Sequence, residues 1–107
     1  MITVIFDQRG CKAFFKRYVH QQAIIERQIS DAVNREIATG MTKVKLATRT
    51  KVSGASCYEF RTNLGKLGSA RLAFIHQGHR AIVVFISHDL QKSTFSHELI
   101  QILGVTK

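Results

Sequence analysis

The chain has 107 residues, 45% of them hydrophobic, which fits one globular domain over residues 1–107 and excludes a disordered chain. Its net charge is +9, and its two cysteines, Cys11 and Cys57, are too few for a disulfide scaffold. No apolar run approaches the roughly 20 residues that cross a bilayer, and the segment MITVIFDQRG lacks the pattern of a signal peptide, so we expect a cytoplasmic protein without a membrane partner.

The positive charge is concentrated in one third of the chain. Residues 43–80 hold eight of the sixteen lysines and arginines, with Glu59 as their single acid. Such a local excess is an electrostatic footprint for a polyanion, most often a nucleic acid. An anionic membrane surface is disfavoured because the basic segment has the periodicity of a strand and not of an amphipathic helix.

The first 42 residues predict a strand followed by a helical pair. Residues 2–6 are β-branched and aromatic, which is typical of a strand. Residues 11–39 contain no Gly or Pro and carry an apolar stripe at helical spacing. Because this stretch is long for one helix in so small a domain, we expect a break near residues 20–22 and an end at Gly40.

After Gly40 the periodicity becomes that of strands. Residues 43–52 place four cations on one side (Lys43, Lys45, Arg49 and Lys51), and we expect their apolar partners to face the core (Val44, Leu46 and Val52). Three further strands are predicted at residues 57–62, 70–75 and 80–87. Residues 93–103 predict a short closing helix.

This order of elements predicts an α+β fold. We expect a small, largely antiparallel twisted sheet with the N-terminal helical pair packed on one face and the short C-terminal helix closing the chain. The other face, or one edge of it, is then free for function.

The register of the hairpin at residues 76–79 decides which side chains meet. A two-residue turn at Gln77-Gly78 places His76 opposite His79, and Arg71 opposite Val84. Since side chains alternate, Arg71 and His88 then share one face, on the order of 13 Å apart at ~3.3 Å per residue. That width suits a site that grips several atoms of a long substrate.

The residue types limit the reactions that this chain could catalyse. No carboxylate pair, phosphate-binding loop or nucleophile triad is apparent, and His76 and His79 are too few for a zinc site, so we expect no metal and no cofactor. Arginine, lysine and histidine remain, with little acid. Cleavage of RNA through its own 2′-OH needs only this set, because the substrate supplies the nucleophile, cations stabilise the phosphorane and histidine moves protons.

The segments CYEFRT (57–62) and SARLAFIHQGHRAIVVFISHDLQKSTFSHELIQIL (69–103) resemble the second half of the RelE/ParE superfamily of bacterial toxins. Members often show a Tyr-x-hydrophobic-Arg strand, an Arg-hydrophobic-x-hydrophobic strand, an apolar strand, a basic loop and a short C-terminal helix. The resemblance implies a toxin of a type II toxin–antitoxin system that forms a hetero-oligomer with a cognate antitoxin. Many members are metal-independent, ribosome-dependent endonucleases of messenger RNA (mRNA interferases).

The resemblance also implies roles for individual residues. Arg71 matches an arginine that binds phosphate and stabilises charge, and Lys92 lies in the loop where the nucleases place a basic catalytic residue. Several nucleases have a tyrosine where this chain has Phe95, which can stack on a base but cannot move a proton, so His88 is the nearest replacement as acid or base. The other expected RNA-binding residues are Lys43, Lys45, Arg49, Lys51 and Arg61.

Two other functions stay open from the sequence. One is a ParE-like inhibitor of DNA gyrase without chemistry of its own, which Phe95 and the weakly basic loop at residues 89–92 favour. The other is a noncatalytic nucleic-acid-binding module. For the basic segment, the alternative to an RNA contact is a solvated edge strand whose lysines block aggregation.

Overall fold

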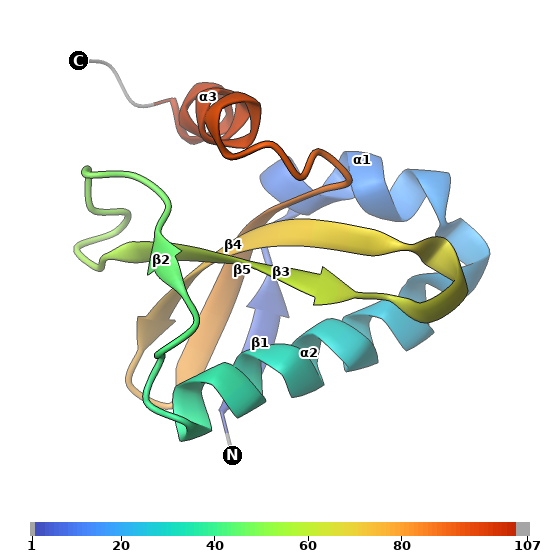
Figure 1. The fold of residues 1–107 in the computed structure, drawn as a ribbon, viewed down its shortest axis with the longest axis horizontal. Coiled ribbons are helices and arrows are strands. Elements are labelled where there is room, and N and C mark those ends of the chain that lie inside the picture. Colours follow the sequence, from blue (N-terminus) through green and yellow to red (C-terminus); the bar gives the residue numbers. More distant parts are fainter. Residues whose placement is uncertain (1, 105–107) are drawn as a thin grey trace.

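A five-stranded sheet forms the centre of the computed structural model, which describes residues 2–104 (Figure 1). Along the chain the elements are β1 (Thr3–Phe6), α1 (Gln8–Arg17), the 3₁₀ helix η1 (Val19–Gln21), α2 (Gln22–Ala38), β2 (Lys45–Leu46), β3 (Cys57–Asn63), the 3₁₀ helix η2 (Gly65–Leu67), β4 (Ser69–Gln77), β5 (Arg80–Ser87) and α3 (Lys92–Leu103). The strand order is β1-β5-β4-β3-β2, with β1 parallel to β5 and all other pairs antiparallel. The predicted α+β class is confirmed.

The N-terminal helices form as the sequence predicts. The Asp7 carboxylate caps α1 by accepting the amide of Arg9 at 3.0 Å. The helical stretch breaks after Arg17, and η1 separates α1 from α2 close to the expected position. Gly40 follows α2 with a φ of 82°, a left-handed conformation that stops a helix. No helix within residues 2–104 combines the length and the apolar character that crossing a membrane requires.

The sheet separates two apolar clusters. On one side, α1 and α2 pack on the sheet through a larger cluster that includes Phe14, Phe15, Ile25, Ile29, Val33, Leu72, Phe74, Val83 and Ile86. On the other side, α3 packs through a smaller cluster that includes Ala47, Cys57, Ala73, Ile75, Val84, Phe85, Phe95 and Leu99. In Figure 1, α3 lies on the side of the sheet away from α2. We refer to these sides as the α1/α2 face and the α3 face.

The predicted strand at residues 43–52 is mostly wrong. Only Lys45 and Leu46 pair with β3, and Leu46 is 54% exposed instead of facing the core. Ala47 takes the buried position, at 5% exposure. Pairing with β3 stops after the Ala47 amide, which donates to Cys57 at 2.8 Å, and farther on Val52 and Ala55 exchange hydrogen bonds of 2.8 and 2.9 Å around a tight turn.

The predicted hairpin exists, but its register differs in two ways. The turn lies at Gly78-His79, so that Gln77 pairs with Arg80. Gly78, with a φ of 60°, takes the first central position, where a type II′ turn needs glycine. A bulge opposite Ala73 and Phe74 then leaves Val84 without a partner in β4, and beyond it Arg71 pairs with Ser87 instead of Val84.

Candidate nucleic-acid site

Glu59 is the one charged side chain among those recorded as buried within residues 2–104, at 1% exposure. It lies on β3 and faces α3, since its neighbour across the sheet is Ala73. A guanidinium nitrogen of Arg71 donates to its Oε1, and Lys92 Nζ lies 3.8 Å from its Oε2. The carboxylate is therefore held between two cations from β4 and the start of α3.

The sheet register adds two more cations on this face. Arg61 pairs directly with Arg71, and Lys45 pairs directly with Glu59. Directly opposed residues share a face, with Cβ atoms about 5 Å apart. Lys45, Arg61, Arg71 and Lys92 thus surround Glu59, and we call these five residues the cationic cluster.

The cationic cluster is not neutralised internally. Four cations face one carboxylate, and arginines directly opposite one another repel. Glu59 Oε2 and Arg71 Nε are buried and make no hydrogen bond. Buried polar atoms are nearly always hydrogen-bonded, so bonding capacity is left over beside Glu59 and Arg71, as it is at Glu36 Oε1 of α2. An anionic group would offset the repulsion between the arginines and could accept from Arg71 Nε, whereas Glu59 Oε2 only accepts and needs a donor such as a hydroxyl.

Two contacts besides the ion pair with Glu59 fix the position of the Arg71 side chain. Its Nη2 donates to the carbonyl of Leu90 at 2.8 Å, and its guanidinium carbon lies 5.9 Å from the ring centre of Phe95. Phe95 is fully buried against Phe85, at 4.9 Å between ring centres. The expectation that Phe95 stacks on an RNA base is therefore wrong for this conformation, and the ring instead supports the arginine.

His88 lies on the opposite face, contrary to the expectation that it shares a face with Arg71. Its ring packs on Phe14 of α1, at 4.9 Å between ring centres. His88 Nδ1 lies 3.1 Å from the carbonyl of Ser69, and a carbonyl only accepts, so this nitrogen carries the proton. In the neutral ring, Nε2 then accepts from the hydroxyl of Tyr18 at 2.6 Å. Both nitrogens are occupied, which suits a structural bridge and not a group that serves Arg71.

The bulge is the cause of this separation. If β5 continued from the turn without the extra residue, Arg71 would pair with Ile86, and His88 would share its face. Val84 shifts the pairing by one residue, so Ser87 takes the place beside Arg71. A change of one residue moves every following side chain to the other face.

The remaining predicted RNA-binding residues are exposed. Lys43, Arg49 and Lys51 lie in the irregular segments on either side of β2. The second of these segments packs on the α3 face, through Ala47, Val52 and Ala55. Their contact with RNA stays a prediction, and the structure adds that Arg49 and Lys51 belong to a segment on the same face as the cationic cluster.

No family model, no curated protein and no solved structure matches the chain. The cationic cluster therefore carries the functional argument by its own geometry. In the described part of the chain, no three His, Cys, Asp or Glu side chains lie together as a metal site would require.

The sequence did not lead us to predict Glu59 as a site residue. A signal was present, because Glu59 is the single acid among the eight cations of residues 43–80 and stands two residues from Cys57 in a strand. Strand alternation places it on the same face as Cys57, which is buried. An acid at an inward position of a basic strand indicates an internal ion pair.

Proposed function

We propose that this chain is a toxin of the RelE/ParE type that cleaves messenger RNA without a metal, through the 2′-OH of its substrate. One observation carries the proposal. A buried carboxylate with an unbonded oxygen lies among four cations on one face of a small sheet. The α+β order of strand, helical pair, strands and short helix agrees with the resemblance seen in the sequence.

The cationic cluster contains the groups that this reaction needs, with Glu59 in the role first expected of His88. Glu59 Oε2 accepts the proton of the 2′-OH as the 2′-oxygen attacks phosphorus. Arg71 and Lys92 stabilise the charge that develops on the phosphorane. The bond from phosphorus to the 5′-oxygen breaks, the leaving oxygen takes a proton from Lys92 Nζ, and a 2′,3′-cyclic phosphate and a 5′-hydroxyl result.

Glu59 is buried, so substrate reaches it only if neighbouring side chains move, and Lys92 is the more exposed of its two ion partners. Glu59 is 1% exposed, whereas the Lys92 side chain is 52% exposed and lies 3.8 Å from Oε2. A lysine has a flexible four-carbon stem, so its rotation away from the carboxylate costs little. A substrate phosphate competes with Glu59 for the same ammonium group, which couples RNA binding to exposure of the base.

The decisive experiment compares Glu59→Gln with Glu98→Gln, an exposed acid of α3. Each chain is induced in cells, and the ends of messenger RNA are mapped by primer extension. Glutamine keeps the shape of Glu59 but accepts no proton, so we expect cleavage to fall by about 10²–10⁴. Binding of a messenger RNA oligonucleotide should not weaken, because the cluster becomes more positive. Cleavage by Glu59→Gln at the rate of the unchanged protein would disprove the assignment.

A second function is favoured by the burial of Glu59. In this conformation Arg71 and Lys92 already have an anionic partner, which suits a surface that binds without chemistry. A gyrase inhibitor would arrest growth with intact messenger RNA, whereas a noncatalytic nucleic-acid-binding module would be harmless when expressed alone. Gyrase-dependent breaks in DNA after induction identify the first, and RNA binding without either lesion identifies the second.

The predicted RNA contact of residues 43–51 can be tested separately. Alanine at Lys43, Lys45, Arg49 or Lys51 should lower the slope of log affinity against log salt by about one for each phosphate contact removed. Lys66→Ala, an exposed site in η2, is the control and should leave the slope unchanged. Equal slopes for all of these variants would show that the lysines are a solvated edge.

A further inference from the structure

The strand β1 is open along its outer edge. Its inner edge bonds to β5, with the amide of Thr3 donating to His79 at 3.0 Å and the amide of Asp7 to Val83 at 2.9 Å. In a parallel ladder only alternate residues bond to a given neighbour. The amides and carbonyls of Val4 and Phe6 therefore point away from the sheet.

Within residues 2–104, the hydrogen bonds from a side chain to this edge are those at Ile2. Asn34 of α2 bonds both backbone groups of Ile2: the Ile2 amide donates to Oδ1 at 2.8 Å, and Nδ2 donates to the Ile2 carbonyl at 3.1 Å. The amide of Asn34 thus occupies the place of a neighbouring strand. Among the hydrogen bonds of residues 2–104, no side chain does the same for Val4 or Phe6.

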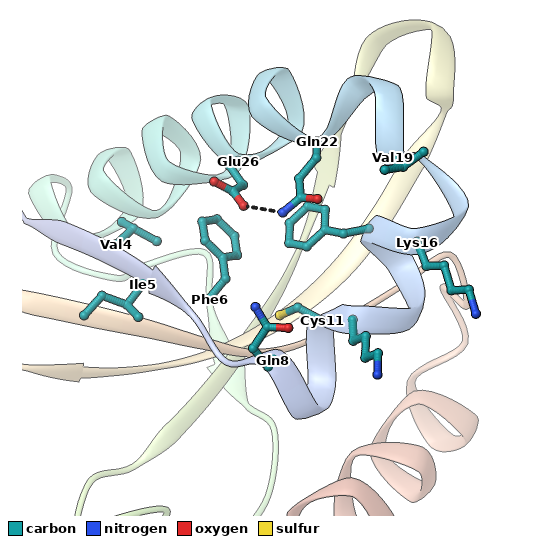
Figure 2. Close-up of a pocket in the computed structure, with 11 residues that line it drawn as sticks. Val4, Ile5, Phe6, Gln8, Cys11, Lys16, Val19, Gln22 and Glu26 are labelled. Atoms are coloured by element: carbon teal, nitrogen blue, oxygen red, sulfur yellow. Dashed lines mark hydrogen bonds between the residues drawn. The ribbon is translucent and has the colours of Figure 1, made fainter.

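A groove of about 530 Å³ lies beside this open edge, between β1, α1, η1 and α2 (Figure 2). Val4, Phe6 and Phe15 contribute apolar surface to it. Ile5 and Val19 also line the groove and are 41% and 59% exposed, so both add apolar surface that solvent reaches. An open edge and an exposed apolar lining thus occur together.

The charge at the groove selects among possible occupants. Lys12 and Lys16 of α1 line it and are exposed. Glu26 is its single acid, and Gln22 Nε2 already donates to that carboxylate at 2.9 Å. The chain carries a net charge of +9, so a second copy would be repelled, whereas an acidic partner would be attracted.

We infer that this groove binds an extended, acidic segment of a partner protein, which adds a sixth strand beside β1. Main-chain hydrogen bonds to Val4 and Phe6 supply affinity, and apolar side chains of the segment enter the groove. Its carboxylates lie near Lys12 and Lys16. The inference does not depend on the proposed nuclease activity, because it concerns the opposite end of the sheet order from the cationic cluster.

The probe is an acetylated, amidated hexapeptide of alternating glutamate and valine, titrated into the ¹⁵N-labelled full chain and followed by NMR. We expect shifts concentrated at residues 4–6, 12 and 16, and slower hydrogen exchange at the amides of Val4 and Phe6. The same peptide with N-methylated backbone on its bonding edge keeps every charge but cannot extend the sheet. It should bind at least tenfold more weakly. Equal binding of the two peptides, or no shift at these residues, would overturn the inference.

Charge variants test the choice of partner. Lys12→Glu with Lys16→Glu should weaken the glutamate–valine peptide at least tenfold, whereas Arg27→Glu with Lys66→Glu, which changes net charge equally at exposed sites, should weaken it far less. A lysine–valine peptide should not bind. Equal loss in both double variants, or the same shifts on addition of an RNA oligonucleotide alone, would refute an acidic protein segment as the occupant.

Discussion

His88 on one face of the sheet and the Glu59–Arg71 pair on the other differ in how completely their polar atoms are hydrogen-bonded. On the α1/α2 face, His88 has both ring nitrogens hydrogen-bonded, to Tyr18 and to the Ser69 carbonyl. On the α3 face, Glu59 and Arg71 each keep a buried atom without a hydrogen bond. The polar atoms of His88 are bonded within the protein, whereas Glu59 and Arg71 have bonding capacity left over. The contrast concerns these two places and not the whole faces, because Glu36 Oε1 of α2 is also buried without a hydrogen bond.

The largest effect is expected where the α1/α2 face is most tightly packed. A Cβ added at Gly10 of α1 would lie 1.6 Å from the carbonyl oxygen of Val84. This oxygen belongs to the backbone of β5 and cannot rotate away as a side chain could. Gly10→Ala must therefore push α1 away from β5 and should cost more than about 4 kcal/mol of unfolding free energy. Urea unfolding followed by circular dichroism measures this. Ala13→Gly, at an exposed site of the same helix, should cost about 1 kcal/mol.

The next largest effect tests the α3 face. Arg71→Ala leaves the buried Glu59 without its main partner and should cost about 3–5 kcal/mol. Arg61→Ala removes the same kind of side chain from the adjacent, exposed position and should stay within about 0.5 kcal/mol. If both variants unfold at the same urea concentration, the ion pair of Arg71 adds nothing to stability, and the contrast between the two places fails.

The two thiols provide a matched pair, one on each face. Burial raises the pKa of Cys11 and of Cys57 from 9.0 to about 12, and for Cys57 the nearby Glu59 carboxylate adds to the rise. Between these pH values the unfolded chain loses thiol protons that the folded chain keeps, so raising the pH favours unfolding. Each thiol should lower stability by about 1.4 kcal/mol per pH unit above pH 9.

Unfolding of Cys11→Ala and Cys57→Ala from pH 8 to 11 measures the contribution of each thiol. Glu59→Gln should reduce the alkaline sensitivity that Cys57 causes and leave that of Cys11 unchanged. An equal response of the two thiols to Glu59→Gln would contradict a charged Glu59 beside Cys57.

The smallest effect concerns the hydroxyl that completes the bonding of His88. Tyr18→Phe removes the donor to Nε2 and should cost about 1 kcal/mol. Tyr58→Phe removes a hydroxyl for which residues 2–104 provide no recorded hydrogen bond, and it should stay within about 0.5 kcal/mol. Thermal unfolding of both variants separates them. A Tyr18→Phe variant as stable as Tyr58→Phe would show that the bridge through His88 is dispensable.

Periodicity predicted the elements that are long and regular. The break between α1 and α2, the strand β3 and the β4–β5 hairpin all follow from apolar spacing and from glycine positions. The strand predicted at residues 43–52 was wrong because alternation of charged and apolar residues also occurs in irregular segments. Of these residues, only Lys45 and Leu46 pair with β3.

Part of the predicted set of site residues lies together in the structure. The resemblance implies roles for Arg71, Lys92, Arg61 and Lys45, and the structure gathers these four around Glu59, while their function stays a prediction. His88 lies on the other face because of the bulge at Val84. No sign of this bulge appears in the sequence, since Val84 is an ordinary strand former and no turn residue stands beside it. A bulge of this kind follows from packing of distant elements, which a single sequence does not display.

The parallel pair of β1 and β5 has a consequence for how the chain is made. Thr3 lies beside Arg80, so β1 has no strand neighbour until the ribosome has made β5. Until then the β1 edge and its apolar side chains have nothing to pair with, and contacts so distant in sequence form slowly. The sheet therefore cannot close until β5 has been synthesised, and until then β1 is prone to associate with other strands.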